Sequence, residues 1–254
     1  MRPRELLAPA LLAARSFAPT PPPGAWRNLL LHDIPRHRYD DLARLLDHVA
    51  ARHGFIAPSE VITRKDGPLR CVLNFDDGFK GNRDVAERLL APRGIRAIFF
   101  VNPGLIESQT DDTYMSWDDL AALARAGHVI GAHGQFHVRL AGLPADELEA
   151  QIVRAREALT GRLGAPDWFA YPFGDIDSVD AAALDLIGRH YRHCRSGVRG
   201  LNVPATHRLA VLADNVELDA GWAWQKLTVA GGLDGRYEPA RARLLRMAES
   251  ASRS

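Results

Sequence analysis

Short apolar segments of strand length alternate with segments of helix length from Trp26 onward, and this alternation constrains the fold most strongly. Strands that alternate with helices are typical of βαβ units, in which the strands run parallel. Roughly six or seven such units in one chain favour a β/α barrel over an open sheet, so we predict a single α/β domain. We expect strands at 28–32, 70–74, 97–101, 128–131, 168–171 and 208–211, and helices at 39–52, 82–90, 117–126, 145–162 and 179–188.

Local signals at the ends of the expected helices support these predictions. Ser116 and Asp119 form an S-x-x-D capping box at the start of one helix, and Gly127 follows its last turn. Pro144 stands at the first turn of the next helix, where proline is favoured. Towards the C-terminus the pattern weakens, and the region around Trp222 only leans towards helix.

The N-terminal segment differs from the rest of the chain. We expect residues 1–25 to form a short helix and a proline-rich linker, ahead of one catalytic domain over residues 26–254. Two arginines precede a short apolar run at 6–14, which is a weak export signal because Pro9 interrupts it and Pro19 would adjoin the cleavage site. We therefore favour a cytoplasmic location and leave export open. No run reaches the ~20 apolar residues of a membrane-spanning helix.

Charge and cysteine content exclude several kinds of function. The chain has 32 basic and 31 acidic residues, a formal net charge of +1, so electrostatics offer no reason to expect a nucleic acid or an anionic membrane as partner. Cys71 and Cys194 are too few for a disulfide scaffold and form no CxxC pair. The ten histidines are the feature of the composition that suggests a chemical function.

Two adjacent carboxylates follow the strand expected at 70–74. The strand continues into the sequence LNFDDGF, in which Asp76 and Asp77 precede Gly78. Active sites of β/α folds are built at the carboxyl ends of the strands. Because neighbouring residues of an extended chain point in different directions, one carboxylate can bind a metal ion while the other moves a proton. A solvated Asp-Gly turn has the same sequence, so this segment alone does not decide between the two.

His133 and His137 lie four residues apart, just after the strand expected at 128–131. One helical turn would place both imidazoles on the same face, and pairs at this spacing hold zinc in H-E-x-x-H sites. With one strand-end carboxylate they make three ligands and leave open coordination positions, which is typical of catalytic zinc. The other aspartate then supplies the base for a metal-activated water.

Three motifs together resemble the polysaccharide deacetylase family, the NodB-homology domain of carbohydrate esterase family 4. Residues 74–78 (NFDDG) are similar to its TFDDG motif, residues 133–137 (HGQFH) to its H-S/T-x-x-H motif, and residues 169–174 (FAYPFG) to its third motif. The resemblance covers roughly residues 26–212, and LLHD at 30–33 resembles a permuted subgroup that has an early histidine motif and FAYPYG as its third motif. It implies a distorted barrel of seven or eight mostly parallel strands.

The resemblance implies a role for each matching residue. Asp76 is expected to be the catalytic base, and Asp77, His133 and His137 are expected to hold one divalent metal ion, for which we favour Zn²⁺. His32 matches the early histidine motif and is expected to be the general acid. The implied reaction removes an acyl group, above all N-acetyl, from an amino sugar or glycan.

The third motif implies further site residues. Tyr171, Pro172 and Phe173 are expected to line the oxyanion or substrate pocket. Ala170 stands where most members have an arginine that orders the base, and Arg208 is our candidate for supplying a guanidinium to Asp76 from a neighbouring strand.

Two smaller departures from the family pattern concern polar contacts. Asn74 replaces the usual Thr or Ser before the paired aspartates, and Gly134 follows His133 where a hydroxyl residue is usual.

Two other functions stay open. An amidohydrolase acting on a small non-polysaccharide amide or a cyclic amide would keep the metal site and change the substrate. A non-catalytic sugar-binding pseudoenzyme is suggested by the missing third-motif arginine, although the expected base, acid and ligands are all present. An iron oxygenase has the same ligand types but a different H-x-D spacing. The sequence does not indicate an oligomeric state.

Overall fold

Seven parallel strands form one sheet in the order β6-β5-β4-β3-β2-β1-β7 in the computed structural model, which describes residues 7–15 and 19–251. The first five strands in chain order lie close to the predicted bounds, which confirms the expected single α/β domain. The strands are β1 (Trp26–Leu31), β2 (Arg70–Phe75), β3 (Ala97–Val101), β4 (Val129–Ala132), β5 (Trp168–Ala170), β6 (His193–Arg195) and β7 (Asp214–Asn215).

The segment 208–216 closes the curled sheet into a barrel. Its first part lies along β6, where the Val211 N–H donates to the Cys194 carbonyl oxygen at 3.0 Å. Its second part contains β7 and lies along β1, where the Val216 N–H donates to the Leu30 carbonyl oxygen at 2.9 Å. One irregular segment thus contacts both sides of the sheet, and the barrel is distorted, as predicted.

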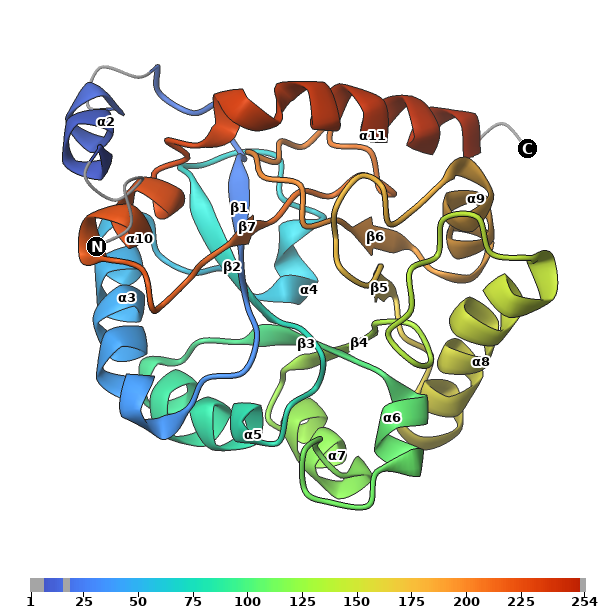
Figure 1. The fold of residues 1–254 in the computed structure, drawn as a ribbon. Coiled ribbons are helices and arrows are strands. Elements are labelled where there is room, and N and C mark those ends of the chain that lie inside the picture. Colours follow the sequence, from blue (N-terminus) through green and yellow to red (C-terminus); the bar gives the residue numbers. More distant parts are fainter. Residues whose placement is uncertain (1–6, 16–18, 252–254) are drawn as a thin grey trace.

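Helices surround the strands on the outside, as Figure 1 shows for α3, α5, α7, α8, α9 and α11. The helix predicted at 82–90 is divided, because α5 continues into a π-helical turn at Ala86–Leu90. The α-helices are α2 (Ala8–Arg15), α3 (Tyr39–Arg52), α4 (Pro58–Val61), α5 (Gly81–Val85), α6 (Pro103–Ser108), α7 (Trp117–Arg125), α8 (Ala145–Leu163), α9 (Ala181–His190), α10 (Trp222–Val229) and α11 (Glu238–Ala251), with 3₁₀ turns at Arg36–Arg38, Ala91–Arg93 and Asp234–Tyr237.

Side chains alternate across β2 between two hydrophobic clusters. Leu73 and Phe75 point outward into the large core between the sheet and the helices, whereas Val72 points into the barrel. Asn74 also points inward, because its side chain donates to Asn28 Oδ1 of β1 at 3.2 Å. The next inward position along the same strand is Asp76. The period of two therefore directs this carboxylate into the mouth of the barrel.

The parts of the fold that differ from the sequence predictions are short or peripheral. β6 and β7 were not expected, because their short sequences, HCR and DN, are mostly polar and lack the apolar run that marks β5. The strand expected at 208–211 is reduced to one parallel bridge between Arg195 and Val211. The expected N-terminal helix is present as α2 and packs against α10.

Part of the predicted export signal falls on residues 1–6 and 16–18, which lie outside the described residues. Among the described helices, none combines the length and the apolar character needed to cross a membrane. The domain boundary near residue 25 and the cytoplasmic location stay predictions.

Candidate active site

The carboxyl ends of the strands bring the sequence-predicted residues to one end of the barrel. His32 follows β1, Asp76 and Asp77 follow β2, His133 follows β4, and Phe173 lies three residues after β5. All five line one cavity of about 530 Å³. The same cavity is lined by Leu30, His137, Asp175, Ile176, Arg195, Gly197, Val198, Arg199, Asn215, Glu217, Tyr237 and Ala240.

Three side chains form a cluster that can hold a metal ion. Asp77 Oδ1 lies 3.4 Å from His133 Nε2 and 3.2 Å from His137 Nε2, and all three ligand atoms lie within 4.8 Å of one another. Burial acts to raise the pKa of Asp77, but hydrogen bonds and positive charge from His133 and His137, in their protonated form, outweigh it and hold that pKa well below its usual range. The carboxylate is therefore ionised and available as a ligand.

The hydrogen bonding of this cluster fits a cation. His133 Nδ1 lies 2.7 Å from the Ala170 carbonyl oxygen, which can only accept, so Nδ1 carries a proton; in the neutral ring, Nε2 then presents a lone pair towards Asp77. Asp77 Oδ1 is buried and has no hydrogen-bond partner among the described residues. Two unshared electron pairs thus face each other, an arrangement that is costly unless a positive ion lies between them. Carboxylate oxygen and imidazole nitrogen are ligands that zinc accepts.

The backbone is strained at the same place. Among the described residues, the non-glycine residues with positive φ are Asp77 (70°), His137 (54°) and Phe173 (66°). Such conformations are uncommon and tend to occur at functional sites. Gly134 also has positive φ (76°), and a Cβ there would lie 3.3 Å from Pro172 Cγ. The backbone therefore explains why glycine replaces the usual hydroxyl residue after His133.

Two buried amides hold the loop that carries both histidines. Gln151 of α8 accepts two backbone N–H groups at its Oε1, from Gln135 at 3.1 Å and from Phe136 at 2.9 Å. The side chain of Asn102, which follows β3, donates to the carbonyl oxygen of His133. The loop is thus positioned by two neighbouring elements before any ligand binds.

Asp76 is buried and its carboxylate is shared between two neighbours. Oδ1 accepts a hydrogen bond from Nη2 of Arg195, at the end of β6, and Oδ2 lies 3.8 Å from His133 Nε2. The sequence-based candidate for this contact, Arg208, is wrong. Its guanidinium donates instead to backbone carbonyl oxygens, including that of Gly188 at 3.2 Å. Arg195 was missed because the register of a three-residue strand cannot be read from sequence.

Of the remaining predicted residues, some line the cavity and others are buried in the core. His32 is exposed at the cavity, and the Phe173 side chain is 55% exposed with its ring centroid 4.7 Å from that of His137. Tyr171, by contrast, is fully buried in the outer core, and Pro172 is buried beneath Gly134. Of the three third-motif residues, only Phe173 lines the cavity.

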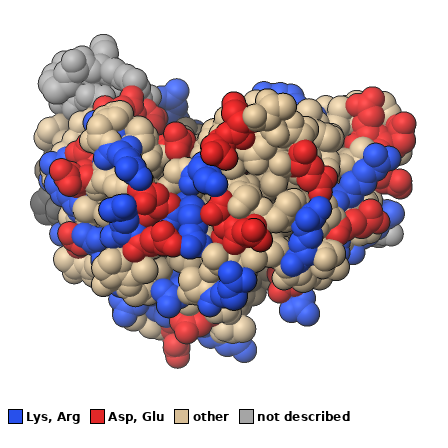
Figure 2. Space-filling model, turned by 90° about the horizontal axis from the view of Figure 1, so that it is seen from below, with Lys and Arg blue, Asp and Glu red and all other residues tan. Residues whose placement is uncertain are grey.

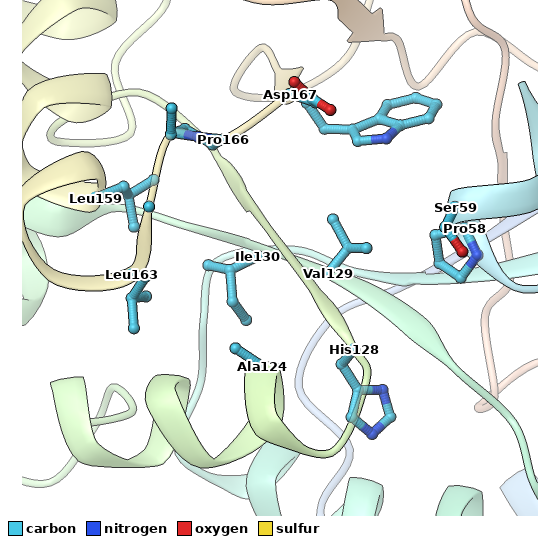
Figure 3. A pocket seen from close by; sticks show the side chains of 13 residues that line it. Pro58, Ser59, Ala124, His128, Val129, Ile130, Leu159, Leu163, Pro166 and Asp167 are labelled. Atoms are coloured by element: carbon cyan, nitrogen blue, oxygen red, sulfur yellow. The ribbon is translucent and has the colours of Figure 1, made fainter.

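A second cavity, of about 270 Å³, lies at the opposite end of the barrel (Figure 3). Its wall includes His128 and Val129 at the start of β4 and Trp168 at the start of β5. His128 Nδ1 accepts the Ala97 N–H at 3.1 Å, and burial lowers the pKa of this imidazole to about 4. The ring is therefore neutral and serves the start of β3 structurally.

The face shown in Figure 2 carries basic and acidic side chains interspersed, without a broad area of one sign. This distribution agrees with the net charge of +1.

Comparison with known proteins places this geometry in a family. The model of the polysaccharide deacetylase family matches residues 63–191, just over half of the chain. The chain belongs to the polysaccharide deacetylase family. A curated chitin deacetylase from Pestalotiopsis sp. is 28% identical over 143 residues, 56% of this chain and 47% of that protein. The chain thus matches about half the length of this relative.

Solved structures of several deacetylases share the fold of this chain. The Streptococcus pyogenes deacetylase PplD, in complex with acetate, has 17% identity and a TM-score of 0.70, covering 82% of this chain and 99% of that one. IcaB from Ammonifex degensii has 20% identity and a TM-score of 0.68, covering 84% and 98%. A de-N-acetylase from Aggregatibacter actinomycetemcomitans has 14% identity and a TM-score of 0.67, covering 80% and 99%.

Proposed function

We propose that this chain is a metal-dependent hydrolase that removes an acyl group, above all N-acetyl, from an amino sugar or glycan. The observation that carries the proposal is the convergence of Asp77 Oδ1, His133 Nε2 and His137 Nε2 within 4.8 Å, in the same cavity as the second carboxylate, Asp76. Family membership supports the carbohydrate as substrate class.

We propose Zn²⁺ as the ion that Asp77, His133 and His137 hold. When bound, a divalent ion supplies polarisation of the acyl carbonyl group and a lowered pKa of water. The protein's part is to keep the three ligand atoms together: the Ala170 carbonyl oxygen fixes the tautomer of His133, and Gln151 holds the loop. Contacts within the fold therefore help to hold the ligand atoms in place.

Asp76 is the proposed general base. Its Oδ1 is engaged by Arg195, so Oδ2, on the side of His133, is the oxygen that accepts the proton from the attacking water. The side chain of Asp76 is only 4% exposed, so little of it is open to bulk water. Adjacent aspartates thus have different tasks, because one turns into the barrel and the other has the left-handed backbone conformation.

His32 is the proposed general acid. It continues the inward alternation of β1, two residues after Leu30, and both line the cavity. An exposed imidazole can exchange protons with solvent between turnovers, and its role is to protonate the departing amine of the sugar. The backbone N–H of Phe173 is the proposed donor to the oxyanion, and the exposed ring of Phe173 offers an apolar face to a sugar.

The test is acetate release from N-acetyl sugars, oligosaccharides and nucleotide-linked or lipid-linked amino sugars by protein reconstituted with Zn²⁺. We expect Asp77→Asn to lose both tight zinc binding and turnover, whereas Asp76→Asn should retain zinc and lose turnover. An active Asp76→Asn protein would exclude Asp76 as the base. Absence of release from every substrate, with zinc bound, would overturn the proposal in favour of the amidohydrolase or the pseudoenzyme.

A further inference from the structure

We infer that Arg195 is the positioning residue of the catalytic base, and that it acts from β6 in place of an arginine on β5. The inference rests on the proposed function, because it concerns the orientation of Asp76 for that reaction. It assigns a task to a residue that lies outside the matched segment 63–191.

The contact divides the two carboxylate oxygens of Asp76. Arg195 Nη2 donates to Oδ1, whereas Oδ2 lies 3.8 Å from His133 Nε2. A carboxylate is planar, so fixing one oxygen also fixes the direction in which the other points. Arg195 therefore selects Oδ2 as the oxygen that faces the metal-ligating cluster.

The environment of Arg195 is poorly explained by stability alone. Its side chain is fully buried, and its Nε and Nη1 atoms have no hydrogen-bond partner among the described residues. The guanidinium carbon lies 4.8 Å from the centroid of the Phe100 ring, which offsets part of the cost of burial. Replacing a whole buried ion pair by apolar side chains of similar volume is often neutral or even stabilising, so stability alone does not require the Arg195–Asp76 pair. The arginine is therefore explained by its effect on Asp76.

The sheet register explains how β6 can supply this group. Ala170 of β5 is the register partner of Arg195 on β6, so the two Cα atoms are neighbours across the parallel pair. Ala170 belongs to the inner cluster, together with the Phe100 ring on which Arg195 lies. Ala170 leaves room where an arginine is usual in the family, and the guanidinium enters the same part of the barrel from the adjacent strand.

The principal test compares Arg195→Met with the wild-type enzyme, using Zn²⁺ affinity, thermal unfolding, kcat and KM. We expect Arg195→Met to unfold at a lower temperature, because the buried Asp76 loses its partner, but still to fold and to bind zinc within ~3-fold of wild type. Its kcat should fall ~100-fold, with KM changed less than ~3-fold. Added guanidinium ion should restore part of kcat, because it can occupy the vacated space beside Asp76. Arg208→Ala is the matched control, since that arginine donates to carbonyl oxygens on the outside of the barrel, and its kcat should be unchanged.

A second pair of variants keeps the test decisive if methionine impairs folding. Arg195→Lys should keep more kcat than Arg195→Met, and the double variant Ala170→Arg/Arg195→Ala should recover kcat relative to Arg195→Ala alone. Retention of kcat within ~3-fold in Arg195→Met would overturn the inference while leaving the proposed function intact. Loss of zinc affinity and kcat in parallel, without rescue by guanidinium or by the double variant, would also overturn it. An inactive but zinc-bound wild type would instead refute the proposed function.

Discussion

Replacing Gln151 with alanine is expected to loosen the loop that carries both metal-ligating histidines. The Gln151 Oε1 atom accepts the backbone N–H groups of Gln135 at 3.1 Å and of Phe136 at 2.9 Å. Alanine removes this acceptor without touching any ligand atom. The substitution therefore weakens the support of the loop and leaves the three metal ligands unchanged.

The magnitude follows from the burial of the two donors. A buried donor left without a partner costs about 1–3 kcal/mol. The bond from the Gln135 N–H is buried, so this donor should incur most of that cost, whereas the bond from the Phe136 N–H is only partly buried and should incur less. We expect a total loss of about 2–3 kcal/mol. If the metal-free loop opens and so avoids this cost, the free energy is lost from zinc binding instead of from unfolding, and about 2–3 kcal/mol weakens zinc affinity by roughly 30-fold to 150-fold.

Two measurements check this prediction: urea unfolding of the metal-free protein and zinc affinity by competition with a chromophoric chelator. Gln151→Glu is the matched control, because a carboxylate oxygen can accept the same two N–H groups, and it should stay within about 1 kcal/mol of wild type. The reasoning is refuted if Gln151→Ala unfolds within ~0.5 kcal/mol of wild type and binds zinc equally tightly.

Three further predictions concern stability away from the ligands. Arg27→Met should cost about 3–5 kcal/mol in urea unfolding, because it leaves the buried Asp214 without the guanidinium now 2.8 Å away; a loss under ~1 kcal/mol would contradict this. Burial lowers the pKa of His128 from 6.5 to about 4, so the folded state binds fewer protons than the unfolded state; its contribution to stability is present above about pH 6.5 and falls as the pH drops towards 4. His128→Gln, which can still accept the Ala97 N–H, should show a shallower loss of stability in this range, and an equal slope would count against the assignment. Ser116→Ala removes the capping box of α7 and should cost about 1 kcal/mol by thermal unfolding; an unchanged Tm would contradict it.

Much of the fold could be predicted because its signals are local. β3 has the bounds expected from its apolar run, and the capping box at Ser116 is present as predicted. α3 likewise begins and ends where its pattern does. In each case the decisive interactions lie within a few residues of sequence. Parallel pairing then follows, since helices between the strands leave room for a crossover connection.

The candidate site could be predicted in part for the same reason. Asp76 and Asp77 follow β2, and the HGQFH segment follows β4, so both groups lie at the same end of a parallel barrel. What sequence reasoning could not place were groups whose role depends on a distant neighbour. Tyr171 belongs to the same motif as Phe173, yet one is in the core and the other lines the cavity, because a positive φ at Phe173 turns the chain.

The sequence by itself determined β1 to β5 and the main helices between them, the residue types that carry the chemistry and the end of the barrel at which they lie. Only the tertiary structure decided that Arg195 contacts Asp76, that Oδ2 of that carboxylate faces His133, and that the segment 208–216 closes the barrel. The physical reason is register. Which residue of β6 faces Ala170 depends on packing between strands far apart in the chain, and a shift of one residue would turn Arg195 to the opposite face of the sheet.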